Sequence, residues 1–218
     1  MNVQKTHNSS HIEKTSQNGS VYFLDFKGDD EALLKAIKNS DNGAKRALYE
    51  RYAKHVERVI LRIMGVDDEI PDLISETFVQ AYKSIHTVKN APSLKAWISR
   101  VAVFVSRGRI RQRKRRRMFM VFTGTEQNDK RTTELDIEGR EALIILYRLL
   151  DELSADERIV FALRFIDGRG FIEMTEICNV SRATLNRRLD RAQAKFLDMA
   201  KGEPVLADWI KRGTRWQI

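Results

Sequence analysis

The segment from Phe171 to Phe196 constrains the fold most, because it predicts two helices joined by a tight turn. In its second half, apolar residues recur at spacings that place them on one stripe of a helix. That stripe consists of Leu185, Leu189, Ala192 and Phe196. A helix with this pattern packs on one side and leaves its arginine-rich side for a partner.

The turn between these predicted helices has suitable residues. Asn179 tolerates a left-handed backbone, and Ser181 can cap the second helix by accepting hydrogen bonds from its free N–H groups. This is the pattern of a DNA-binding helix-turn-helix. An ordinary helical hairpin with a solvated basic face has the same spacing and is the alternative interpretation.

Composition favours an all-α protein. The chain has 218 residues, 42% of them hydrophobic, which suffices for the packed cores of two small domains or one larger one. It contains only three prolines and few alternating β-branched runs. The net charge of +9 suits a polyanionic partner, although charge alone does not separate DNA from RNA or an anionic membrane.

Much of the positive charge is concentrated in one basic run. Eight of the eleven residues from Arg107 to Arg117 are basic, and the run continues an amphipathic segment that contains Trp97 and Phe104. A solvated tail has the same charge pattern. The attachment to an amphipathic helix favours a defined DNA-binding face.

Several functional classes are not expected. A single cysteine, Cys178, excludes an intramolecular disulfide and a CxxC metal motif, and the four histidines lack ligand spacing. We expect no metal and no cofactor, and no enzyme, since neither a nucleophile–base pair nor a phosphate-binding glycine loop is recognisable. Without a signal peptide or a membrane span, the prediction is a cytoplasmic protein with no membrane insertion.

Composition shifts divide the chain into five parts. We expect a disordered N-terminal extension (1–28), a helical domain (29–118), a flexible acidic linker (119–139), a helix-turn-helix domain (140–201) and a C-terminal extension (202–218) with Trp209 and Trp216. Ser154 and Glu157 form the spacing of a capping box. The apolar run from Met118 to Phe122 has no evident purpose.

Four motifs resemble the sigma-70 family of RNA polymerase sigma factors, in its extracytoplasmic function group. They are DLISETFVQAY at 72–82, the Trp97-containing helix with its basic run, LSADER at 153–158 and RLDRA at 188–192. The resemblance spans about Asp29 to Ala200 and implies two helical domains, similar to regions 2 and 4 of the family.

The resemblance implies core RNA polymerase, through its clamp and flap, and promoter DNA as partners, and leaves open whether an anti-sigma factor also binds. The first domain is expected to hold the clamp and to melt the minus-10 element. The predicted clamp contact is a polar stripe opposite the apolar stripe of one helix. It consists of Asp72, Ser75, Glu76 and Gln80.

Promoter contacts are expected in both domains. The minus-10 set combines a base-capture loop with arginines for phosphates: Lys89, Asn90, Lys95, Arg100, Arg107, Arg109, Arg111 and Arg113. The minus-35 set lies on the second helix of the helix-turn-helix: Ser181, Arg182, Ala183, Thr184, Asn186, Arg187, Arg188 and Arg191. Arg182, Asn186 and Arg187 are the predicted base readers. Trp97 is predicted to lie in the core.

Some residues depart from the family pattern. Phe104 and Gly108 stand where the family usually has Asn and Asp, which predicts an unusual minus-10 preference or weak strand opening. Thr175 and Cys178 occupy apolar helix-turn-helix positions. The alternative function is a free-standing helix-turn-helix regulator, which would bind its DNA site tightly without polymerase.

Overall fold

The structure is a computed structural model that describes residues 26–123 and 137–206. Within these ranges every regular element is helical, which confirms the all-α prediction. The predictions for residues 1–25, for the linker between 124 and 136, and for Trp209 and Trp216 lie outside the described residues.

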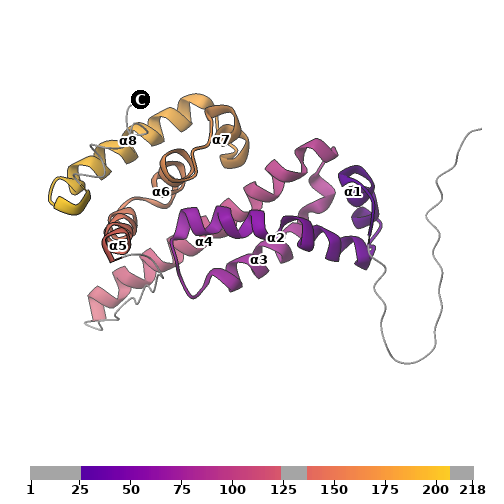
Figure 1. The fold of residues 1–218 in the computed structure, drawn as a ribbon, viewed down its shortest axis with the longest axis horizontal. Coiled ribbons are helices and arrows are strands. Elements are labelled where there is room, and N and C mark those ends of the chain that lie inside the picture. Colours follow the sequence, from indigo (N-terminus) through magenta and orange to yellow (C-terminus); the bar gives the residue numbers. More distant parts are fainter. Residues whose placement is uncertain (1–25, 124–136, 207–218) are drawn as a thin grey trace, which may run out of the picture.

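The first half of the chain forms four helices connected by short turns (Figure 1). They are α1 (Asp30–Lys38), α2 (Asn42–Met64), α3 (Ile70–Ser84) and α4 (Leu94–Thr123), with the 3₁₀ turns η1 (Ile85–Thr87) and η2 (Ala91–Ser93) before α4. Local chemistry sets the first boundaries. Asp29 and Asp41 accept backbone N–H groups as N-caps, and Gly65, at φ 82°, follows the end of α2.

Helix α4 is longer than predicted. The first domain was expected to end at residue 118, whereas the helix continues to Thr123 and includes the apolar run that begins at Met118. No glycine or proline interrupts the sequence between residues 109 and 123, so nothing local stops the helix earlier. Met118 and Phe119 are exposed on this extension.

The second half forms a compact helical group beside α4 (Figure 1). It comprises α5 (Ile137–Glu152), α6 (Ala155–Phe161), the π-helical turn η3 (Ala162–Ile166), α7 (Phe171–Cys178) and α8 (Arg182–Ala200). The predicted capping box is confirmed, since Ser154 and Glu157 each accept the other's backbone N–H. The π-turn was not predicted; Asp167 N–H donates to the Ala162 carbonyl, five residues back.

The predicted apolar stripe of α8 is confirmed as core. Leu185, Leu189, Ala192 and Phe196 are buried, and the Phe196 ring centroid lies 4.5 Å from that of Phe161 in α6. Packing of α8 on α6 therefore fixes the orientation of the arginine-rich side of α8.

The two halves meet at the end of α2. Arg158 is only 2% exposed, and its guanidinium donates to the carbonyl oxygens of Ile63 (2.8 Å) and Met64 (2.9 Å). It also pairs with Asp151. The Tyr147 hydroxyl donates to the carbonyls of Leu61 and Arg62. The second half thus supplies donors for helix-end carbonyls that have no partner within α2.

Position 65, at this junction, requires a glycine for two reasons. Its backbone, at φ 82° and ψ −175°, lies in a region that essentially only glycine adopts, and an added Cβ would approach the Tyr147 ring to 2.8 Å. We expect Gly65→Ala to lower the free energy of unfolding by about 1–3 kcal/mol, measured by urea denaturation.

Gly108 provides a matched control. It lies inside α4, and an added Cβ there would meet no atom within 4 Å. Gly108→Ala should therefore raise the free energy of unfolding by about 0.5–1 kcal/mol through its higher helix propensity. Equal effects of the two substitutions would contradict the assigned role of Gly65.

The capping box predicts a pH dependence of stability. Burial opposes ionisation of Glu157, but hydrogen bonds from Lys195 (2.8 and 3.0 Å) and Ser154 outweigh it and lower the pKa of Glu157 to about 2. The folded-state pKa thus lies below the ordinary value of 4.5. This stabilisation is complete above that value and is lost as the pH falls toward 2.

We expect the difference in unfolding free energy between wild type and Glu157→Gln to be constant above about pH 5 and to shrink below it. Chemical denaturation at a series of pH values measures this difference. A difference independent of pH down to the folded-state pKa would contradict the assignment.

Candidate polymerase and nucleic-acid interfaces

Helix α3 presents the predicted polar stripe on its outer face. Asp72, Ser75 and Glu76 are exposed and Gln80 is half-buried. The opposite stripe is buried, as predicted: Leu73, Thr77, Phe78, Ala81 and Ile85. The Glu76 carboxylate lies 3.8 Å from the Arg109 guanidinium, so part of its charge is already compensated within the domain.

The predicted base-capture residues lie on an anchored loop between η1 and α4 and in the first turn of α4. Lys89, Asn90 and Lys95 are exposed. The loop is held because Val88 is buried and its carbonyl accepts a 2.6 Å hydrogen bond from Lys38. Exposed polar side chains on a fixed loop suit contact with an unpaired strand.

Two arginines of the predicted minus-10 set pair within their own domain. Arg113 bonds to Asp67 (2.7 and 2.8 Å) and to Glu69, and Arg109 lies 2.8 Å from Glu69. Burial works against the charged form of Arg113, but these carboxylates raise its pKa above the ordinary value. Its position favours a structural role, holding the turn between α2 and α3, over a phosphate contact.

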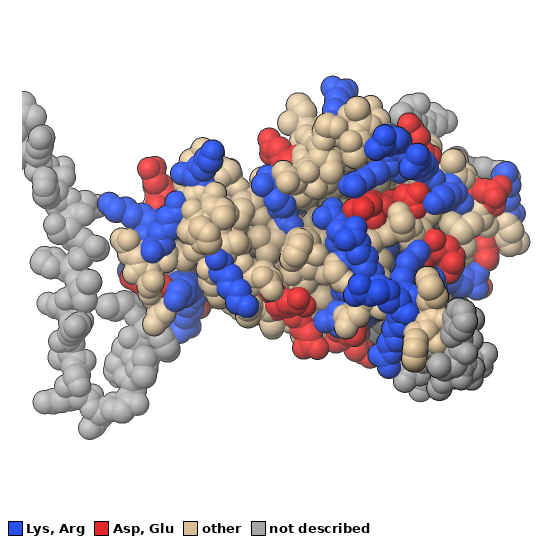
Figure 2. All heavy atoms as spheres, turned by 180° about the vertical axis from the view of Figure 1, so that it is seen from behind, with Lys and Arg blue, Asp and Glu red and all other residues tan. Residues whose placement is uncertain are grey.

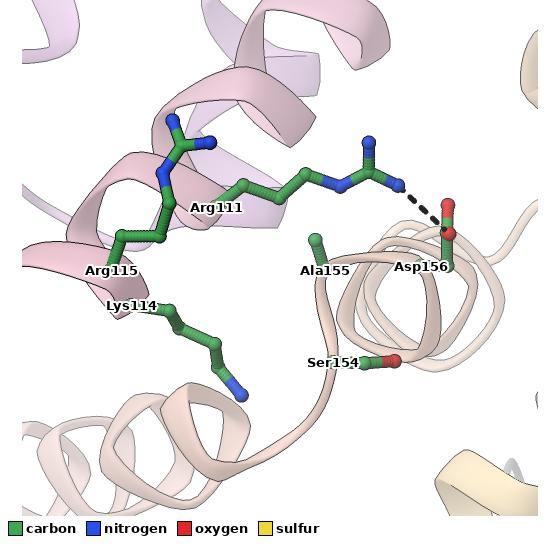
Figure 3. Close-up of a pocket in the computed structure, with 6 residues that line it drawn as sticks. All are labelled: Arg111, Lys114, Arg115, Ser154, Ala155 and Asp156. Carbon is green, nitrogen blue, oxygen red and sulfur yellow. Dashed lines mark hydrogen bonds and ion pairs between the residues drawn. The ribbon is translucent and has the colours of Figure 1, made fainter. Parts of the chain in front are cut away.

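Three other arginines of α4 face the second half of the chain. Arg107 and Arg111 lie 2.9 Å and 3.4 Å from the two oxygens of the Asp156 carboxylate, and Arg100 donates to the Glu176 carbonyl at 3.0 Å. Figure 3 shows Arg111 extended toward Asp156 at the start of α6. Sequence reasoning missed Asp156, which reads locally as an ordinary acidic residue in the first turn of a helix.

The helix-turn-helix has the predicted geometry. Asn179 adopts φ 53° and ψ 52°, and the Ser181 hydroxyl accepts from the Thr184 N–H at 3.2 Å. Most of the predicted minus-35 residues are exposed on α8 or at its N-cap: Ser181, Arg182, Ala183, Asn186, Arg187 and Arg191. Thr184 and Arg188 are partly buried, and Arg188 lies 3.5 Å from Asp156.

Phe171, at the start of α7, is a residue that the sequence did not single out. The guanidinium carbon of Arg164 lies 4.8 Å from its ring centroid and that of Arg182 lies 5.8 Å away. These distances are typical of cation–π contacts. The ring therefore restrains Arg182, the first residue of α8.

A groove of about 860 Å³ is lined by residues of α3, α4, α7 and α8. Its lining combines exposed Phe104 with six basic side chains and one carboxylate: Lys83, Arg100, Arg107, Arg111, Arg115, Arg188 and Asp156. Figure 2 shows basic side chains crowded, with carboxylates among them, over the part of the molecule that contains the end of α4. The surface is therefore strongly basic, but the carboxylates within it neutralise part of its positive charge.

Two other residues that could carry chemistry, Cys178 and Trp97, are buried in the core. Cys178 is buried, which raises its pKa to about 11 and leaves the thiol protonated and unreactive. Trp97 is 8% exposed and belongs to the core, as predicted.

The described part of the chain contains no cluster of three or more His, Cys, Asp or Glu that could hold a metal ion. None of its described helices is long and apolar enough to cross a membrane.

Comparisons with known proteins match both domains. A family model for sigma-70 region 2 matches residues 48–116, and one for sigma-70 region 4 matches residues 143–196. Among curated relatives, the ECF RNA polymerase sigma-E factors of Haemophilus influenzae and Escherichia coli are each 25% identical over 173 residues. These alignments cover 75% of this chain and 91% and 90% of the respective relatives.

Two solved structures share the fold. CnrH in complex with the cytosolic domain of CnrY has a TM-score of 0.53 and 18% identity, covering 80% of this chain and 98% of that chain. The sigma factor RpoE with the anti-sigma factor NepR from Bartonella quintana has a TM-score of 0.50 and 19% identity, covering 71% and 95%. The chain belongs to the sigma-70 family of RNA polymerase sigma factors, in its extracytoplasmic function group.

The contact between Phe171 and Arg182 can be tested directly. Phe171→Leu removes the aromatic face, whereas Phe171→Tyr keeps it. We expect Phe171→Leu to shift the Arg182 side-chain Nε–H resonance and to lower the free energy of unfolding by about 1 kcal/mol, with little change in Phe171→Tyr. An Arg182 resonance that is the same in all three proteins would contradict the contact.

Proposed function

We propose that this chain is a promoter-specific initiation factor, which binds core RNA polymerase through the clamp and flap and directs it to promoters with two recognition elements. The main support is that both family matches fall on separate helical domains, one bearing the polar α3 face and the other the helix-turn-helix. A free-standing regulator is not favoured, because a regulator that acts without polymerase would not need a domain similar to sigma-70 region 2.

The clamp contact is assigned to the outer face of α3. Asp72, Glu76 and Gln80 share that face, so a basic helix of the polymerase could pair with them in one orientation. Both carboxylates are exposed in the free chain, and Glu76 also lies 3.8 Å from the Arg109 guanidinium. Their main contribution is therefore to the rate and orientation of association.

Minus-10 contacts are assigned to the anchored loop and to α4. Lys89, Asn90 and Lys95 are available to an unpaired strand. Because Trp97 is buried, we take Phe104, which lies on α4 and is 62% exposed, as the aromatic surface for this strand. We assign base stacking to Phe104, where it replaces the hydrogen bonds that the usual Asn would supply.

Minus-35 recognition is assigned to α8. Arg182, Asn186 and Arg187 are exposed on the side of the helix away from its core stripe. In a major groove, arginine reads guanine and asparagine reads adenine through paired hydrogen bonds. Ser181, Thr184 and Arg191 would then contact phosphates and set the register.

The other partners and properties follow from this function. The chain needs no catalytic group or cofactor, because the polymerase performs the chemistry, and it acts in the cytoplasm with that polymerase. An anti-sigma factor is a further proposed partner, supported by the partner named in the RpoE structure.

Charge reversal on α3 separates the sigma factor from the free-standing regulator. We expect Asp72→Lys combined with Glu76→Lys to weaken binding to core polymerase by about tenfold or more, while binding to duplex DNA is retained. Co-purification with core polymerase and a DNA mobility assay measure the two effects.

Glu31→Lys combined with Glu57→Lys is the matched control, because both residues are exposed on α1 and α2 and the change in net charge is the same. This control should keep its affinity for polymerase. If the α3 double variant binds polymerase and supports transcription like wild type, the clamp assignment is wrong.

A further inference from the structure

The second domain is docked on the first through a two-part interface. One part is largely buried and joins Tyr147 and Arg158 to the carbonyls at the end of α2. The other part is ionic and lies along α4, where α6 and α7 pack (Figure 1). The described residues thus form a closed arrangement of the two domains.

Asp156 is the centre of the ionic part. Its carboxylate lies within 3.5 Å of guanidinium nitrogens of Arg107 and Arg111 from α4 and of Arg188 from α8. Without this carboxylate, three positive charges from two domains would face one another. Asp156 therefore replaces, within the chain, the anion that these arginines would otherwise bind.

In the closed arrangement, one of the two proposed DNA-binding surfaces contacts the other domain and the second is exposed. On α4, Arg100 donates to the Glu176 carbonyl, and Arg107 and Arg111 pair with Asp156. On α8, Arg182, Asn186 and Arg187 remain exposed. One surface is engaged by the other domain, and the other is open to solvent.

From this asymmetry we propose that the second domain masks the arginine face of α4 in the free chain while the minus-35 reading face stays open. This inference rests on the proposed function for the identity of the two surfaces. DNA phosphates and the Asp156 carboxylate compete for the same guanidiniums. The free factor can then engage duplex DNA through α8, and separation of the domains releases α4.

Salt dependence of DNA binding tests the masking. Asp156→Asn removes the competing charge, and Asp190→Asn, at an exposed position on α8, makes the same change in net charge elsewhere. The probe is a nonspecific 20-base-pair duplex. Each arginine that gains a phosphate contact steepens the plot of the logarithm of the binding constant against the logarithm of the salt concentration by about 0.9.

We expect Asp156→Asn to bind this duplex about fivefold more tightly and to steepen the slope by about two to three, since Arg107, Arg111 and Arg188 all lose this carboxylate partner. Asp190→Asn should leave the slope unchanged. Identical slopes for the two variants would overturn the proposal.

A distance measurement provides a second test that needs no change at Asp156. Labels on Glu57→Cys in α2 and Ala194→Cys in α8 report the separation of the domains, and buried Cys178 stays unlabelled. The otherwise wild-type chain should show one short distance at low salt, where the buried and the ionic contacts together hold the domains closed. A broad long distance at low salt would contradict a closed free state.

These measurements use neither polymerase nor a promoter, so they can fail separately from the proposed function. If the chain directs transcription but Asp156→Asn behaves like Asp190→Asn, masking is wrong and the function stands. If masking is observed but no transcription is stimulated, the assignment of the two surfaces to promoter elements is wrong.

Discussion

The guanidinium of Arg158 is the interaction on which the arrangement of this molecule depends. It is almost completely buried, pairs with Asp151 of its own domain and donates to two carbonyls at the end of α2 in the other. A buried cation without these partners would be strongly unfavourable. Because Arg158 of α6 bonds to the end of α2, it ties together two helices from different domains, where η3 also packs on α2 and α6 packs on α4.

Much of the functional surface follows from that placement. Once α6 lies beside α4, Asp156 reaches Arg107 and Arg111, and α7 reaches Arg100. The reading side of α8 points away, because its opposite stripe is fixed on Phe161. The arginines of α4 and α8 discussed above therefore differ in role: Arg113 holds a turn, Arg107 and Arg111 pair across the domain interface, and others are left exposed on α8.

Local features of the fold were predictable because their causes are local. Helical periodicity identified the buried stripes of α3 and α8, and the capping box and the left-handed Asn179 were correctly predicted from residue type and spacing. The pairing of Arg113 with Asp67 and of Arg107 with Asp156 was not, since these partners lie 46 and 49 residues apart and no sequence rule joins them. The cation–π contact of Phe171 and the π-turn after Phe161 likewise depend on tertiary packing.

The function that we propose for this chain is to direct polymerase to a promoter through two elements. Its most direct test is transcription from a genomic DNA library by core RNA polymerase with and without the full chain, with start sites mapped by sequencing. We expect new start sites that share two elements at a fixed spacing upstream. No stimulation by the chain, or new start sites without a shared pair of elements, would contradict it.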